Sequence, residues 1–299
     1  MPMTTGQFLV LCEGNLISKV HHEPGTRREL QYSKVFKVGT LDELYLEEAK
    51  MAGFGLLQVM NEGADVTYDE AIAPITKRWD YDTYGLAYNI TRKLQINDRF
   101  GDIAKLEGDL DVSVDDSIET FAFGMLNNIT GTSSTYMTGF DGLALASTAH
   151  TRLDGGATQS NYADVALSYT GVQDGVVRMR KIKNDRGRPV RHDPTKLYIV
   201  ADLMHTAEEI LGSSGNPGNA NNVTNTLGRY GLTWEVLDYV TGTTFCALNA
   251  PTHDVRFVWR TKPTKSMEED FDNGNIKRKV ITDVLRGHGD WRGWDFING

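Results

Sequence analysis

The sequence has little of what membrane, disulfide-rich and zinc proteins need. No run of about 18 apolar residues occurs in its 299 residues, so no segment is long enough to cross a bilayer as a helix. Residues 1–16 contain a short apolar stretch with no basic residue before it, unlike a secretory signal. Cys12 and Cys246 are the only cysteines, which excludes a disulfide framework and a cysteine-rich zinc site. We therefore expect cytoplasmic synthesis, no membrane partner and two buried cysteines.

The strong motifs of enzymes are also absent. The sequence contains no P-loop, no G-x-S-x-G elbow and no H-E-x-x-H. The glycine-rich segment 212–218 follows a predicted helix and includes Pro217, so we interpret it as a loop rather than a phosphate cradle. His21, His22 and Glu23 have no further His or Cys nearby and are interpreted as solvated arm residues. We assign no catalytic, cofactor-binding or metal-binding residue and expect no cofactor.

Acidic residues outnumber basic ones. The chain has 31 Lys and Arg against 40 Asp and Glu, a formal net charge of -9. Gripping nucleic acid requires clustered Lys and Arg, so this is not the main task of the chain. An acidic wall could still enclose DNA and leave the polymer mobile. The basic clusters at 178–183 and 277–279 favour contacts between copies, since opposite charges on neighbouring copies steer assembly.

What the sequence does contain begins with an arm and a hairpin. Residues 1–48 have mixed charge and no sustained period, which is typical of an extended arm. Residues 50–69 are glycine-rich around short apolar runs, and residues 75–94 are rich in β-branched and aromatic residues, as in a strand. Asn61, Glu62 and Gly63 lie between them and indicate a turn. Because an isolated hairpin is marginal, it needs a partner.

The clearest helical signal follows, over residues 98–125. Its apolar residues are spaced by three or four and face an acidic side: Phe100, Ile103, Leu106, Leu110, Val114, Ile118, Phe121 and Met125. Asp98 can serve as the N-cap. Such a helix would be roughly 45 Å long at 1.5 Å per residue, a strut rather than an ordinary helix. A coiled coil is the alternative, disfavoured by Gly101, Gly108 and the lack of a lasting heptad.

The rest of the chain predicts a mixture of helices and strands. Apolar spacing and turn residues indicate a helix over 164–183, a strand over 196–200, a short helix over 202–211 capped by Asp202, a loop over 212–225, strands within 233–260 and a Gly- and Trp-rich tail over 286–299. With 40% apolar residues the chain can bury a sizeable core.

A series of short motifs, in order over nearly the whole chain, resembles one family: the major head subunits of tailed phages with the Hong Kong 97 capsid fold, and within it the Mu-type group. The motifs are Gly53-Phe54-Gly55, Glu62-Gly63, Tyr68-Asp69, Thr83-Tyr84-Gly85-Leu86, Ile90-Thr91-Arg92, Gly101-Asp102, Asp141-Gly142-Leu143-Ala144-Leu145, Thr148-Ala149-His150, Asp185-Arg186-Gly187, Pro194, Leu197-Tyr198-Ile199-Val200 and Asp290-Trp291-Arg292-Gly293. The group usually has Pro where Thr151 stands. Each motif alone is weak, and their shared order carries the resemblance.

The resemblance implies an α+β capsid fold in five parts. These are an N-terminal arm (1–48), an extended loop (49–93), a peripheral domain with a long spine helix (94–190), an axial domain (191–274) and a C-terminal return to the peripheral domain (275–299). It implies hexamers and pentamers that close into an icosahedral shell around double-stranded DNA, assembled in the bacterial cytoplasm. We see no leader that resembles a scaffold and no Lys and Asn pair for cross-linking.

The partners expected are other copies of the chain, a separate scaffolding protein, a portal protein, a decoration or cement protein, and packaged DNA by non-specific contact. Residues expected at contacts between copies are Arg27, Arg28, Phe54, Glu62, Tyr68, Trp79, Arg180, Lys183 and Arg278. An encapsulin-type compartment shell, with the same fold and a similar length, is one alternative. An enzyme of mixed α/β architecture is the other.

Overall fold

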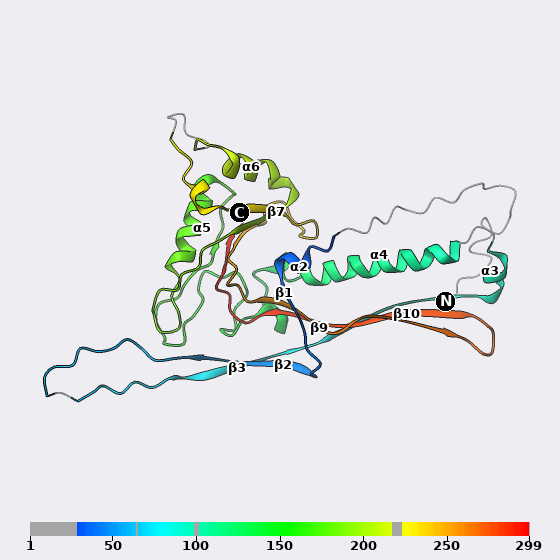
Figure 1. Cartoon of the computed structure of the whole chain (residues 1–299), viewed down its shortest axis with the longest axis horizontal. Helices are drawn as coiled ribbons and strands as arrows, with labels where there is room; N and C mark the ends of the chain where they lie inside the picture. The colour runs from blue at the N-terminus through cyan, green and yellow to red at the C-terminus, as the bar shows by residue number, and fades with distance from the viewer. Residues whose placement is uncertain (1–28, 64, 99–101, 217–222, 299) are drawn as a thin grey trace.

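The chain is elongated, with a projecting hairpin at one end and a helix lying along a long β-ribbon at the other (Figure 1). The computed structural model describes residues 29–63, 65–98, 102–216 and 223–298. Between the two ends stands a second sheet with helices packed on it (Figure 1). Helices and strands are both extensive, so the α+β class predicted from the sequence is confirmed.

The ribbon belongs to a four-stranded sheet in the order β1-β9-β10-β4. β9 and β10 form a long antiparallel hairpin, β4 is antiparallel to β10, and β1 is parallel to β9. The strands are β1 (Lys37–Thr40), β4 (Asp82–Ile90), β9 (Val255–Glu269) and β10 (Ile276–His288). The sheet therefore joins the beginning, the middle and the end of the chain.

The predicted strut is helix α4 (Asp102–Phe123), which lies along this sheet (Figure 1). Its Phe121 stacks on Tyr84 of β4, with ring centroids 3.7 Å apart. The Asp98 carboxylate accepts a hydrogen bond from the backbone N–H of Ile103 at 3.2 Å, but α4 begins at Asp102, so Asp98 lies upstream of the helix and not at the N-cap position predicted for it. With 22 residues the helix is about 33 Å long, shorter than expected, because it begins at Asp102 and ends at Phe123 and so does not span the whole of 98–125. Its apolar face packs within the chain, which excludes the coiled-coil alternative.

The second sheet has five strands in the order β5-β11-β8-β6-β7. They are β5 (Tyr162–Ala163), β6 (Lys196–Ile199), β7 (Thr233–Val236), β8 (Cys246–Asn249) and β11 (Trp294–Ile297). Helix α5 (Tyr169–Lys181) packs on β8 and β11. It approaches so closely that a Cβ at Gly175 would lie 2.7 Å from Leu248. Helix α6 (Met204–Gly212) contributes Ala207 and Ile210 to the apolar cluster that α5 forms with this sheet.

Two helix boundaries differ from the prediction. The helix expected from residue 164 begins at Tyr169, because the Ser168 hydroxyl caps it by accepting the N–H of Gly171, and Val165 is exposed. Asp202 does not cap α6 but lies in the preceding 3-10 turn η3 (Ala201–Leu203). The remaining short helices are α2 (Tyr32–Val35), α3 (Arg92–Asn97), η1 (Leu126–Asn128), η2 (Thr135–Met137) and η4 (Leu227–Tyr230).

One large apolar cluster connects the two sheets. It contains Phe257 of β9, Tyr198 of β6, Trp294 and Phe296 of β11, and Phe123 of α4, all fully buried or nearly so. Cys246 is buried, as predicted, in the adjacent cluster, while Cys12 lies outside the described residues. The two halves of the chain therefore share a core.

The core also corrects the expected boundaries. Val35 and Phe36, assigned to the arm, are buried in the main cluster, and residues 32–48 carry α2, β1 and the start of β2. Residues 1–28 lie outside the described part. Residues 255–269, assigned with 191–254, form β9 of the ribbon because they pair with β10. Helix α5, assigned with α4, packs instead on the five-stranded sheet.

Leu110 offers a test of the spine helix. Its side chain is 7% exposed on the face of α4 that lies against the sheet. We expect Leu110→Asp to lower the free energy of unfolding by about 3 kcal/mol or more, because burying an unpaired carboxylate is costly. Urea unfolding of the purified chain measures this. Thr120→Asp, at an exposed position of the same helix, is the control with little expected effect. Equal stability of both variants would show that α4 does not bury this face.

Candidate assembly surfaces

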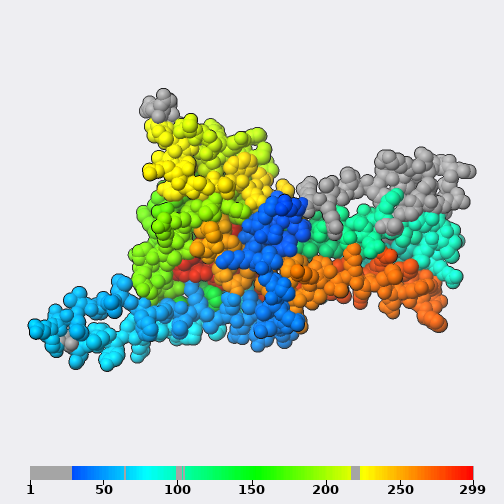
Figure 2. Space-filling view, viewed as in Figure 1, coloured from blue at the N-terminus to red at the C-terminus, as the bar shows by residue number. Residues whose placement is uncertain are grey.

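The most distinctive surface is the hairpin that projects from the body of the chain (Figures 1 and 2). Strands β2 (Tyr45–Ala52) and β3 (Ile72–Asp80) pair with each other alone, as a two-stranded sheet. Their ladder ends at Ala52 and Ile72. We call residues 53–71, which join them, the extended loop. It turns at Glu62 and Gly63, where Gly63 has a φ of 77°, so the turn lies where the sequence predicted it. The paired strands differ from the prediction: β2 lies mostly before the expected run of 50–69, and the single strand expected over 75–94 divides into β3 and β4, which belong to different sheets.

The side chains of the extended loop are both apolar and acidic. Its described residues are all exposed, Leu57 fully and Tyr68 by 96%. Seven large apolar side chains are involved: Phe54, Leu56, Leu57, Val59, Met60, Val66 and Tyr68. Residues 53–71 also contain four carboxylates and no Lys, Arg or His. Apolar side chains gathered on a projecting segment mark a surface that another molecule covers.

A single arginine connects the extended loop to the body. Arg186 lies in the turn after α5, and its Nε donates to the carbonyl of Gly53 at 2.7 Å. A terminal nitrogen of the same guanidinium donates to the carbonyl of Glu70. Another lies 3.5 Å from the Asp69 carboxylate. The other oxygen of Asp69 accepts the N–H of Gly55 at 2.6 Å. This hydrogen bond and the guanidinium lower the pKa of Asp69, so the carboxylate stays charged at neutral pH.

Beside this arginine, a partly buried network of four charged side chains holds the base of the hairpin. Lys50 of β2 lies 3.0 Å from Asp185 and 2.9 Å from Asp290. Arg292 reaches the same two carboxylates, at 3.1 Å and 2.8 Å. Burial alone would raise the pKa of Asp290, but Arg292 and Lys50 outweigh it and lower this pKa to about 2. Two cations and two anions therefore neutralise one another where β2, the 184–188 turn and the C-terminal segment meet.

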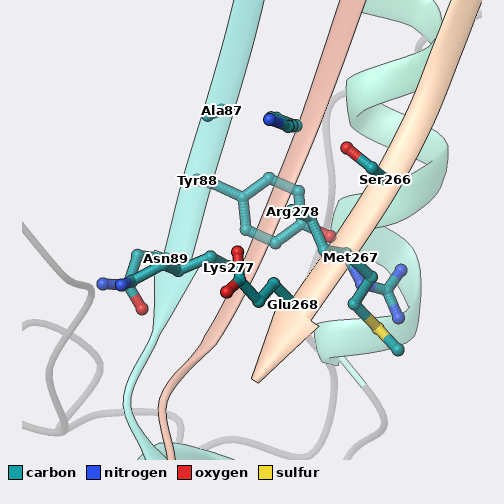
Figure 3. A pocket seen from close by; sticks show the side chains of 9 residues that line it. Ala87, Tyr88, Asn89, Ser266, Met267, Glu268, Lys277 and Arg278 are labelled. Atoms are coloured by element: carbon teal, nitrogen blue, oxygen red, sulfur yellow. The ribbon is translucent and has the colours of Figure 1, made fainter. Parts of the chain in front are cut away.

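At the other end of the chain, strands β4, β10 and β9 carry an open groove of about 710 Å³ (Figure 3). Lys277, Arg278 and Lys279 line it, which is the basic cluster that the sequence indicated. Met267 is largely exposed there, and Phe271 is fully exposed at the β9–β10 turn. Glu268 is the fourth charged residue of the lining, so three of the four are cationic, and an open groove of this kind suits contact with an acidic surface better than enclosed catalysis.

The predicted contact residues fall into three groups. Phe54, Glu62 and Tyr68 lie together on the extended loop and are exposed. Arg180 and Lys183 are exposed near the end of α5, far from the loop in sequence, and Arg180 is paired with Asp193 at 2.5 Å. Arg27 and Arg28 lie outside the described residues, as do His21, His22 and Glu23. Whether the exposed residues contact another copy stays a prediction.

One of the predicted contacts needs correction. Trp79 is 1% exposed and packs against Val258 and Leu285, so it is a core residue of its own chain. Arg278 lines the open groove and its guanidinium pairs with Glu107 of α4, so its contact with another copy stays a prediction. The error at Trp79 arises because the sequence does not show that β3 lies against β9 and β10 of the same subunit.

Sequence reasoning gave no role to Arg186, Asp185, Asp290 or Arg292. The motifs that contain them, Asp185-Arg186-Gly187 and Asp290-Trp291-Arg292-Gly293, were recognised only as part of a resemblance. Their mixed charges and adjacent glycines were a signal for a structured turn. Among the described residues, no group of three or more His, Cys, Asp or Glu could hold a metal ion. No helix within the same residues has the length and apolar character needed to cross a membrane.

Comparisons with known proteins agree on one family. A model described as phage capsid protein matches residues 76–294. A solved chain of Microbacterium phage Oxtober96 is 9% identical with a TM-score of 0.59, over 100% of this chain and 99% of that one. A chain from the capsid of the cyanophage P-SCSP1u is 8% identical with a TM-score of 0.63, over 96% and 91%. A chain from the capsid of Myoviridae phage XM1 is 12% identical with a TM-score of 0.53, over 96% and 100%. No curated protein is a significant match.

The structural likenesses, at such low identity, show the fold: it is the capsid fold of tailed phages, of the Hong Kong 97 type predicted from the sequence. The family is one of structural proteins, so the enzyme alternative is wrong. The Mu-type group is not tested and stays a prediction. Because the family match spans well over half of its residues, the chain belongs to the phage capsid protein family.

Proposed function

We propose that the chain is the major capsid protein of a tailed phage and assembles as hexamers and pentamers into an icosahedral shell around double-stranded DNA. The observation that carries this proposal is the extended loop. Its seven large apolar side chains have no cover within the described part of the chain. Burying one such side chain contributes about 1.5–3 kcal/mol, which the subunit gains only when another molecule covers the loop.

A second copy of the chain is the partner that we propose for the loop. The loop is acidic and contains no Lys or Arg, while the groove at the far end of the subunit is lined by Lys277, Arg278 and Lys279. These surfaces lie at opposite ends of an elongated subunit (Figure 1). Complementary charge at opposite ends favours head-to-tail contacts, which close into rings when the rotation between copies allows it. Capsomers are such rings.

The other partners are proposed from the family resemblance alone. They are a scaffolding protein, a portal protein, a decoration protein and packaged DNA, with assembly in the bacterial cytoplasm. The net charge of -9 supports loose enclosure of DNA rather than tight binding, because like charges repel. We further assign α4 and the four-stranded sheet to the peripheral domain, and the five-stranded sheet with α5 and α6 to the axial domain.

Electron microscopy of the full chain, expressed with and without a scaffolding protein from the same phage, tests the proposal. We expect closed shells of uniform size, and shells that contain DNA in particles purified from infected cells. Shells that hold a cargo protein in place of DNA would favour the encapsulin alternative. A chain that stays monomeric under both conditions would contradict the proposal.

A further inference from the structure

We propose that Arg186 is a positioning residue for assembly: it grips both strands of the extended loop where their ladder ends, and so sets the direction in which the loop leaves the subunit. This inference rests on the proposed function, because the loop direction matters only if the loop meets another copy. The contact itself can be tested on the isolated subunit.

The geometry at Arg186 is that of a clamp. Its Nε bonds the carbonyl of Gly53 on the outgoing strand, and a terminal nitrogen bonds the carbonyl of Glu70 on the returning strand. Gly53 directly follows the last paired residue of β2, Ala52, and Glu70 lies two residues before the first paired residue of β3, Ile72. A guanidinium is planar and carries five donors in a fixed fork, so it can hold two carbonyls at once, whereas a lysine ammonium is a single point charge.

The turn that carries Arg186 is itself held in place by hydrogen bonds and ion pairs. The Asn184 side-chain oxygen accepts the backbone N–H groups of Arg186 and Arg188, at 3.0 Å and 2.9 Å. Gly187, with a φ of 72°, donates its N–H to the carbonyl of Asn184 at 3.0 Å. The side chain of Asp185 is held by Arg292 and by Lys50 of β2. The turn is thus fixed to the body on one side and to the base of the hairpin on the other.

Among the described residues, no side chain other than that of Arg186 forms a hydrogen bond or ion pair between the extended loop and the body of the subunit. The remaining bond at this point, between Gly55 and Asp69, joins the two strands of the loop to each other. Removing one side chain should therefore release the direction of the whole loop and leave the β2–β3 ladder intact.

The test measures the spread of loop positions in the unassembled subunit. Spin labels are placed at Asn61→Cys on the loop and Thr158→Cys on the body, both exposed positions, in a Cys12→Ser background, and their distance distribution is measured by pulsed electron paramagnetic resonance. We expect one narrow distribution for the parent chain and a broad one for Arg186→Ala. Arg186→Lys should resemble Arg186→Ala more than the parent, because one ammonium nitrogen would replace two guanidinium nitrogens that bond different carbonyls. Arg191→Ala, at a nearby exposed arginine that pairs only with Asp193 among the described residues, is the matched control and should stay narrow.

A second measurement ties the clamp to assembly. Particle yield with the scaffolding protein should fall about tenfold or more for Arg186→Ala, since losing preorganisation weakens every copy of the contact, while the thermal midpoint of the subunit stays near that of Arg191→Ala. An unchanged narrow distribution in Arg186→Ala would overturn the clamp. A broad distribution with normal yield and normal particle size would overturn its role in assembly. If the parent chain forms no shells, the proposed function fails, and the distance measurement still decides whether the clamp exists.

Discussion

A chain that lacks residues 61–68 is expected to fold normally and to lose shell formation. These residues form the tip of the extended loop, beyond the Arg186 clamp, and the described ones are all exposed to solvent. The deletion removes Val66 and Tyr68, which are 67% and 96% exposed. If a neighbouring copy covers both side chains, the deletion removes about 3 kcal/mol or more of binding free energy from each contact between copies. This loss lowers the association constant of that contact more than about a hundredfold. Sedimentation of particles after expression with the scaffolding protein measures the loss.

The matched control keeps the length of the loop and changes its chemistry. Replacing residues 61–68 by an equally long Gly and Ser segment removes the apolar and acidic side chains without shortening the hairpin. We expect this variant also to lose shells, because side chains rather than reach make the contact. Thermal unfolding should place both variants within a few degrees of the parent chain. A deleted chain that unfolds would place the loop tip in the core, and one that still forms normal shells would remove the loop tip from assembly.

The features that sequence predicted well are those encoded locally. The spine helix shows in the spacing of Ile103, Leu110 and Ile118, and the hairpin in two strand-like runs around Glu62 and Gly63. Each pattern depends on residues within one or two turns or along one strand, where side-chain periodicity reports which face is buried. The exposed apolar loop followed from the same reasoning, since no neighbouring pattern supplied a cover for it.

What sequence could not show depends on contacts between distant segments. Phe36 reaches Phe257 with ring centroids 6.3 Å apart, and Arg292 reaches Asp185 across 107 residues. The pairing of β1 with β9 is parallel and joins the two ends of the chain. No local period encodes such pairings, so Trp79 was interpreted as a surface contact and residues 32–48 as an arm. The clamp was missed for the same reason: Arg186 is an ordinary turn residue until Gly53 and Glu70 are beside it.

The boundary of the arm leads to the second large expected effect, on stability rather than assembly. We expect removal of residues 1–28 to leave the free energy of unfolding nearly unchanged and removal of residues 1–36 to collapse it. Val35 and Phe36 are 1% and 3% exposed in the main cluster. Tyr32 packs on Phe257 with ring centroids 4.9 Å apart, and its N–H donates to Glu119 at 3.2 Å. Loss of a buried Phe costs about 3–5 kcal/mol by itself, against a total stability of about 5–15 kcal/mol.

Urea unfolding followed by tryptophan fluorescence compares the two truncations. Two point variants of the full chain separate the core contact from the rest of the arm: Phe36→Ala should cost about 3–5 kcal/mol, whereas Val38→Ala, at a position 44% exposed, should cost much less.

The longer truncation also removes the Tyr32 N–H that donates to the Glu119 carboxylate. Burial already raises the pKa of this carboxyl, so losing a donor to its charged form should raise the pKa further and add to the cost at neutral pH. If instead the longer truncation unfolds at the same urea concentration as the shorter one, α2 does not stabilise the subunit core, and the arm extends to residue 48, where the sequence placed its end. A shorter truncation that folds normally but yields few particles would assign residues 1–28 to contacts between copies, because a segment that stabilises only the shell leaves the unfolding of the free subunit unchanged.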